Sequence, residues 1–115
     1  MDKNQLREDS VNFAIAVSDA CDGVKGCSVF VNQLVRASSS IGANIHEARY
    51  AQSRADFISK LEIALKESSE TDYWVELLYR KSKLTEEKYK QLRNLCGSIR
   101  RRLIASITTA KTPKD

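Results

Sequence analysis

Residues that break helices are almost absent from this chain of 115 residues. It has one proline, Pro113, close to the C-terminal end, and only four glycines. In a helix interior, proline costs about 3 kcal/mol and glycine about 1 kcal/mol relative to alanine, so their scarcity favours long helices over short strands. The chain length suits one domain. We therefore expect a single all-α domain over residues 1–115.

Apolar residues recur at spacings of three and four in four successive segments, as in helices with one buried face. The expected helices cover residues 3–22, 29–51, 54–82 and 86–109, with a frayed tail over 110–115. Candidate caps lie in the breaks between them: Gly23 as a left-handed helix end, and Ser28, Ser53 and Thr85 as N-caps. Short connections make consecutive helices antiparallel, so we predict an up-down-up-down four-helix bundle.

The second segment contains an unusual concentration of small residues, in the stretch QLVRASSSIGANIHEA over residues 33–48. Its apolar stripe places Ser38 at the border of the buried face, whereas Ser39 and Ser40 point away from it. Gly42 adds a further loss of helix propensity. Small side chains allow a second helix to approach closely, and one bundle core cannot use all of them. A second contact surface, between copies of the chain, is one explanation.

The third segment also carries apolar residues opposite its core stripe. Ile63, Trp74 and Leu77 project from that side, with Glu70 among them. A cluster of exposed apolar residues indicates a partner surface. We therefore predict a homo-oligomer with these four residues at the interface. The alternative is a tilted monomeric bundle with these residues at its margins.

The formal charge of +4 is unevenly distributed. Residues 1–79 hold 8 basic and 12 acidic side chains, whereas residues 80–115 hold 11 basic and 3 acidic side chains. This basic segment is either a solvated helix face or a surface that binds phosphates of RNA or DNA. Lys90 and Arg101 lie on its outer pole, beside Gly97. The predicted nucleic-acid-binding residues are Lys88, Lys90, Arg93, Arg100, Arg101 and Arg102.

No arrangement of residues indicates an enzyme. His46 is the only histidine, and neither G-x-S-x-G nor a phosphate-binding glycine loop occurs. We expect no metal and no cofactor. No apolar run approaches the ~18 residues of a membrane span, and the N-terminus lacks a secretory signal, so a cytoplasmic protein without a membrane partner is expected.

Three polar residues fall on or beside predicted core faces. Asn44 lies at the margin of the second helix's stripe, and Ser68 and Asp72 lie on the third helix's core face. Because buried polar groups need partners, we expect a cation such as Arg36 or Arg49 to pair with Asp72. These positions are interpreted as fixing the register of the bundle, with a ligand site as the less favoured alternative.

Residues 33–78 resemble a bacterial family of four-helix-bundle proteins. That family includes proteins encoded in intervening sequences of large-subunit ribosomal RNA genes and the accessory variability determinant of diversity-generating retroelements. The shared pattern is R-x-x-x-S-I-x-x-N-I-x-E, followed by DFISKLEIALKE, ETDYW and LTEEKY. The looser resemblance extends over residues 10–112. The motif positions in this chain are Arg36, Ser40, Ile41, Asn44, Ile45 and Glu47.

The resemblance implies a four-helix protomer assembled as a ring, typically a pentamer. Accessory members of the family bind nucleic acid through a basic surface and associate with a reverse transcriptase. The resulting hypothesis is a non-enzymatic, oligomeric nucleic-acid-binding accessory protein. The alternative is a protein–protein scaffold of the ribosomal RNA intervening-sequence type, with no direct role in nucleic-acid binding.

Overall fold

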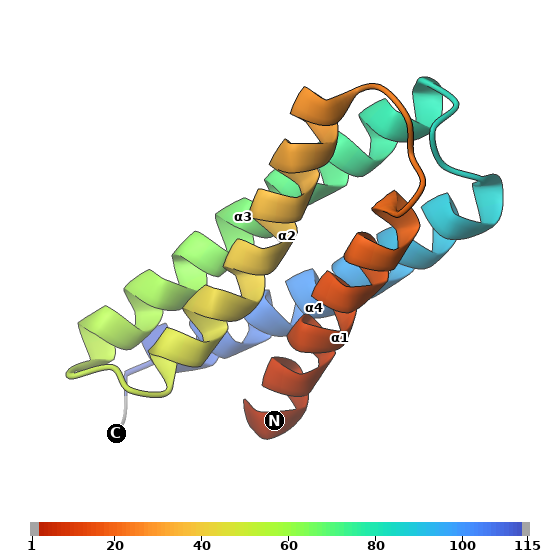
Figure 1. Ribbon diagram of the computed structural model, residues 1–115. Helices are drawn as coiled ribbons and strands as arrows, with labels where there is room; N and C mark the ends of the chain where they lie inside the picture. The colour runs from red at the N-terminus through yellow and green to blue at the C-terminus, as the bar shows by residue number, and fades with distance from the viewer. Residues whose placement is uncertain (1–2, 114–115) are drawn as a thin grey trace.

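The computed structural model describes residues 3–113 and consists of four helices in this range. They are α1 (Lys3–Cys21), α2 (Ser28–Ala48), α3 (Arg54–Arg80) and α4 (Glu86–Lys111). Consecutive helices run in opposite directions (Figure 1). The predicted all-α, up-down-up-down four-helix bundle is confirmed.

The helices pack in the cyclic order of the chain, in a body of 53 × 21 × 20 Å. The α2–α3 contact is the most extensive, α3–α4 and α1–α2 follow, and α1–α4 is the smallest. Over the described residues, the backbones of the diagonal pairs, α1 with α3 and α2 with α4, do not approach closely. At one end, Lys83 Nζ donates to the carbonyl of Lys25 at 2.8 Å and joins the α3–α4 connection to the α1–α2 connection. Each helix therefore has two neighbours, and only side chains fill the centre.

Two of the three predicted N-caps form. Ser53 Oγ accepts a hydrogen bond from the Asp56 amide at 3.0 Å, and Thr85 Oγ1 accepts one from the Lys88 amide at 3.1 Å. Each bond satisfies an amide that has no partner inside its helix. The prediction for Ser28 is wrong: Cys27 is the N-cap, with a left-handed φ of 57° and no side-chain cap, and Ser28 already belongs to α2.

The observed helix ends differ from the predicted ends by three residues or fewer. α2 ends at Ala48 rather than at residue 51, because the amides of residues 49–51 bond to carbonyls three residues back and close a turn. The expected frayed tail over 110–115 is wrong at its start, since α4 continues to Lys111, whose Nζ lies 3.0 Å from Glu62 Oε2 of α3. Residues 1–2 and 114–115 of the predicted domain lie outside the described residues.

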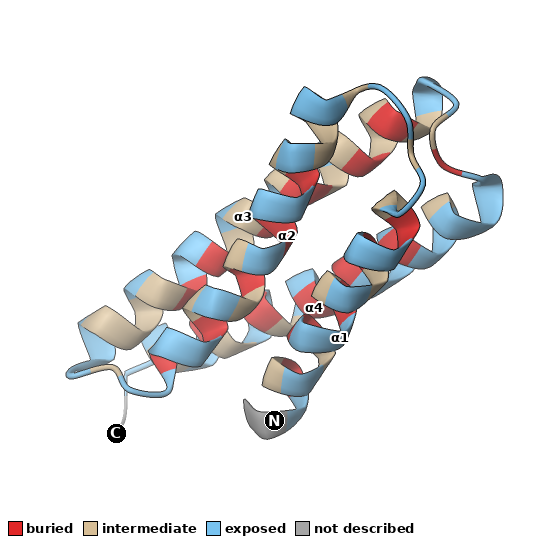
Figure 2. Cartoon of the chain, in the orientation of Figure 1, coloured by how far each residue is buried: buried red, intermediate tan, exposed pale blue. Residues whose placement is uncertain are grey.

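The core is a continuous set of apolar side chains on the inner faces of the helices (Figure 2). None of the described helices carries an apolar stretch able to span a bilayer. The fully buried residues of largest volume include Phe13, Leu34, Ile41, Leu78, Leu92, Ile99 and Leu103.

The core stripe of α3 passes through Thr71 rather than Asp72. Thr71 is fully buried, and its hydroxyl donates to the Glu67 carbonyl at 2.8 Å. A threonine can satisfy its hydroxyl within its own helix, whereas an ionised carboxylate in the core needs a cation. The prediction that Asp72 lies on the core face is therefore wrong, although Ser68 does lie there, fully buried.

The small residues of α2 bring α1 close. Ser38 is buried and donates to the Val35 carbonyl, whereas Ser39 is exposed and Ser40 is partly exposed, as predicted from the stripe. A Cβ atom added at Gly42 would lie 3.1 Å from Oγ and 3.5 Å from Cβ of Ser10, a fully buried residue of α1. Part of the small-residue stretch therefore serves the α1–α2 contact inside one protomer.

This contact leads to a double-mutant prediction. Gly42→Ala gains up to about 1 kcal/mol of helix propensity, but overpacking against the Ser10 hydroxyl outweighs that gain, so we expect a net loss of about 1 kcal/mol of unfolding free energy. Adding Ser10→Ala removes the close Oγ and leaves Cβ at an ordinary contact distance. The double variant should therefore be more stable than the sum of the two single variants by about 2 kcal/mol in urea unfolding, the overpacking that Ser10→Ala relieves. Additive effects would contradict the proposed close contact.

Candidate functional site

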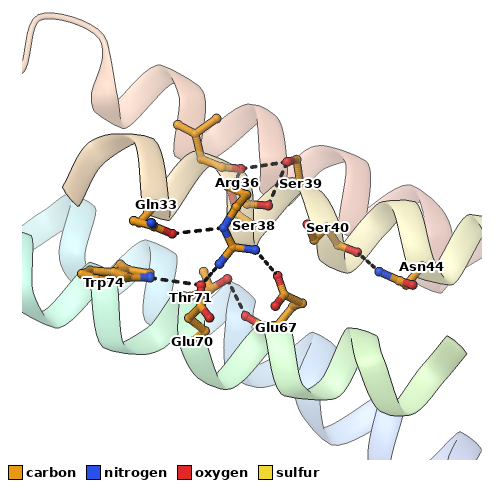
Figure 3. Close-up of polar contacts among 11 residues, drawn as sticks. Gln33, Arg36, Ser38, Ser39, Ser40, Asn44, Glu67, Glu70, Thr71 and Trp74 are labelled. Carbon is orange, nitrogen blue, oxygen red and sulfur yellow. Dashed lines mark hydrogen bonds and ion pairs between the residues drawn. The ribbon is translucent and has the colours of Figure 1, made fainter. Parts of the chain in front are cut away.

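Residues from three of the sequence motifs described above meet between α2 and α3. Arg36 of α2 reaches two carboxylates of α3: Nη1 lies 2.9 Å from Glu67 Oε2, and Nη2 forms an ion pair with Glu70 (Figure 3). Glu67 and Glu70 are three residues apart, so both project from the same side of α3. The guanidinium fork can therefore engage both carboxylates at once. We call Arg36, Glu67, Glu70 and Trp74 the α2–α3 cluster.

Trp74 is fixed within this cluster. Its indole Nε1 donates to Glu70 Oε2 at 3.3 Å, and its ring stacks on Phe30 of α2 with centroids 5.9 Å apart. Arg36 Nε also donates to Gln33 Oε1 at 3.1 Å. The side chain of Glu67 is 13% exposed and that of Arg36 is 48% exposed. One cation therefore faces two carboxylates in a partly buried network with a net negative charge.

The other polar motif residues of α2 lie on the side that carries Arg36, whereas Ile41 and Ile45 are buried in the core. Asn44 donates to the Ser40 carbonyl at 2.8 Å, a bond within the helix, and Glu47 pairs with Lys60 of α3 at 3.5 Å. The motif thus supplies two ionic links between α2 and α3, at Arg36 and at Glu47. Glu70 and Trp74, predicted as residues of a subunit interface, belong to the same network as Arg36 within the protomer: Glu70 pairs with Arg36, and Trp74 donates to Glu70.

The other predicted interface residues of α3 differ in exposure. Ile63 is 42% exposed, whereas Leu77 and Trp74 are partly buried, and Trp74 packs against the edge of the core. The expectation that Arg36 or Arg49 pairs with Asp72 is wrong. Arg36 is held by Glu67 and Glu70, and Asp72 faces α4 instead.

The basic residues of α4 fall into two groups. Four have carboxylate partners within the protomer: Arg93 with Asp72 at 3.1 Å, Arg102 with Asp9 at 2.6 Å, Lys90 with Glu86 at 3.1 Å, and Lys111 with Glu62 at 3.0 Å. These pairs place Arg93 toward α3 and Arg102 toward α1, on opposite sides of the helix. Among the described residues of α4, the cations without a carboxylate partner are Lys88, Arg100 and Arg101.

The ion pairs of Arg93 and Arg102 shift the pKa values of the groups that form them. The pKa of Arg93 is raised, first by the hydrogen bond to the Tyr89 hydroxyl at 2.6 Å and then by the Asp72 carboxylate. The pKa of Asp9 is lowered by hydrogen bonds from Gln5 and Arg102. Both effects favour the charged forms, so these pairs persist at neutral pH. Their guanidinium groups are consequently less available to an external anion than those of Arg100 and Arg101.

Cys96 of α4 lies beside Arg93 and Arg100 and is not a nucleophile candidate. Burial raises the pKa of its thiol to about 12, and Sγ donates to the Ser68 carbonyl at 3.3 Å. A thiol with so high a pKa is almost entirely protonated at neutral pH, and the thiolate is the reactive form. His46 is exposed, and its Nδ1 accepts a hydrogen bond from Arg7 at 3.3 Å.

The chain has clear relatives among known proteins. The model of the 23S rRNA-intervening sequence protein family matches residues 2–105. A solved structure from Bacteroides thetaiotaomicron VPI-5482, a protein with unknown function from the S23 ribosomal protein family, is 42% identical and superposes with a TM-score of 0.88, covering 94% of this chain and 99% of that one. A comparison with proteins of curated function gave no match. Since the family match spans nearly the whole chain, this protein belongs to the 23S rRNA-intervening sequence protein family.

Proposed function

We propose that this protein is a non-enzymatic, oligomeric accessory protein that binds RNA or DNA through α4. The observation that supports it most is the position of Arg100 and Arg101, two exposed neighbours on α4 without a carboxylate partner among the described residues. Lys88 adds a third such cation on the same helix. The last 36 residues hold 11 basic and 3 acidic side chains, so few carboxylates compete with a polyanion there.

Oligomerisation is part of the proposal. Ile63 and Tyr73 of α3 are 42% and 59% exposed and flank the α2–α3 cluster. An apolar surface that carries a fixed tryptophan suits contact with another copy of the chain. In a ring, which the family resemblance suggests as a pentamer, the basic face of α4 would be repeated in every subunit. Each nucleic-acid molecule could then contact several copies.

We also propose a more specific role for this protein, as an accessory subunit of a retroelement reverse transcriptase. Its support is the sequence resemblance over residues 33–78 alone. A reverse transcriptase gene beside this gene, or co-purification of the two proteins, would support the role. A position inside a ribosomal RNA gene without either would favour the other branch of the family.

Binding to a structured RNA hairpin across a salt series tests the main proposal. We expect fluorescence anisotropy to show affinity that falls steeply with salt, and Arg100→Gln/Arg101→Gln to lower the slope of log K against log salt by about 2, one per lost phosphate contact. The matched control is Lys25→Gln/Lys66→Gln, which removes the same charge from exposed residues outside α4. Absent or salt-independent binding would contradict the proposal, and so would an equal loss in the control.

A scaffold without a nucleic-acid role is the second candidate. It is favoured by the intramolecular pairs of Lys90, Arg93 and Arg102, which leave half of the six predicted cations already engaged. The same variants separate the two functions. A scaffold would keep its protein partner and show no RNA binding before or after the substitutions.

A further inference from the structure

A polar groove of about 300 Å³ lies between α3 and α4. From α4 it receives Arg93 and Arg100, which are seven residues and so about two helical turns apart, with Gly97 between them. From α3 it receives Ser69 and Asp72, and Cys96 also lines it. The groove thus combines two guanidinium groups and a hydroxyl, which are donors that proteins use for phosphate oxygens.

Gly97 brings a third guanidinium group to the rim. A Cβ atom at this position would lie 3.3 Å from Nη1 of Arg101, so the Arg101 side chain folds back over the glycine. A glycine in a helix interior costs about 1 kcal/mol relative to alanine. Here the bare backbone leaves space for the Arg101 guanidinium beside the groove.

Asp72 is the only acidic residue that lines the groove, among those described. Its Oδ1 and Oδ2 accept hydrogen bonds from Nε and Nη2 of Arg93 at 3.1 and 3.3 Å. This two-point contact is the geometry that a phosphate would adopt on the same guanidinium. Among the described residues Arg100 has no carboxylate partner, so its charge is left for an incoming anion.

We propose that this groove binds one phosphate group of the nucleic-acid backbone, with Arg100 and Arg101 as its first contacts and Arg93 shared between that phosphate and Asp72. The inference rests on the proposed nucleic-acid-binding function and names the site within it. The Asp72 carboxylate then competes with the phosphate for Arg93 and weakens phosphate binding. We expect removal of the Asp72 charge to increase the affinity for RNA. If the basic helix were only solvated, removal of Asp72 and of another carboxylate of α3 would have the same effect.

Asp72→Asn is the test, with Glu62→Gln as its matched control. Both substitutions remove a carboxylate of α3 that pairs with a cation of α4, but Glu62 pairs with Lys111, far from the groove in sequence. In anisotropy titrations with the RNA hairpin, we expect Asp72→Asn to bind roughly two- to fivefold more tightly, the range of one exposed ion pair. Arg100→Gln should bind more weakly, with a salt slope reduced by about 1. Circular dichroism checks that each variant keeps its helices.

A second measurement separates this inference from the proposed function. Inorganic phosphate is titrated into ¹⁵N-labelled wild-type protein at constant ionic strength, and the amide of Gly97 and the Nε signals of Arg93 and Arg100 are followed by NMR. If RNA binds the wild type but Asp72→Asn and Glu62→Gln behave alike, the groove is excluded and the proposed function stands. If RNA does not bind, the proposed function fails; saturable phosphate shifts at Gly97 and Arg100 would retain the groove as an anion site, and their absence would exclude it.

Discussion

Arg36→Ala is expected to lower the free energy of unfolding by about 2 kcal/mol, within the range for a lost hydrogen bond to a charged group. The substitution leaves Glu67, whose side chain is only 13% exposed, and Glu70 without their shared cation on adjacent turns of α3. Their mutual repulsion and the desolvation of Glu67 then oppose the α2–α3 contact. Because Arg36 itself is 48% exposed, the loss is smaller than for a fully buried pair.

Urea unfolding followed by circular dichroism measures this effect, at one protein concentration because assembly would contribute to stability. The control is Arg80→Ala, which removes an exposed pair with Glu76 one turn away and should cost less than about 0.5 kcal/mol. Arg36→Lys should recover only part of the loss, since an ammonium group lacks the planar fork that spans two carboxylates. Equal losses for Arg36→Ala and Arg80→Ala would show that the cluster does not stabilise the bundle.

If the proposed oligomer forms through this face of α3, Ile63→Lys is expected to convert it into single protomers of 13.0 kDa without loss of helicity. Ile63 is 42% exposed in the protomer, so a lysine there is tolerated when its ammonium group is in water. Burial of that charge against another subunit would be strongly unfavourable. Ile63 is a cleaner probe than Trp74, because Trp74 also contacts Phe30 and Glu70 within its own chain.

Light scattering coupled to size exclusion gives the mass of each variant. Ile104→Lys is the control, because Ile104 of α4 has the same 42% exposure but lies outside the proposed interface. A wild-type mass of one chain would contradict the proposed assembly. A variant that keeps the wild-type mass would remove Ile63 from the interface.

Periodicity predicted the architecture because each helix turns one stripe toward the core. The stripe of α2, through Leu34, Ala37 and Ile41, is buried as expected, and it places Ser38 inside and Ser39 outside. The same reasoning failed for α3 at one position. Over a helix of 27 residues, spacings of three and four can be combined to pass through either Thr71 or Asp72, and the pattern alone does not choose between them.

The candidate site was harder to predict, since it depends on contacts between helices. Arg36 and Glu67 are 31 residues apart, and Arg102 and Asp9 are 93 residues apart. Which carboxylate meets which cation depends on the rotation and register of two helices, and neither follows from the pattern of one. The sequence therefore indicated a basic α4 but did not reveal which of its cations are paired within the protomer.

The small α1–α4 contact has a consequence for how the chain acquires its structure. It joins the two ends of the sequence, so closing it costs more chain entropy than closing a hairpin of consecutive helices. It is also the least extensive of the four contacts between adjacent helices, so it contributes the least packing. The α2–α3 hairpin should accordingly be an early and persistent folding unit, and the seam between the first and last helices should close late and open first.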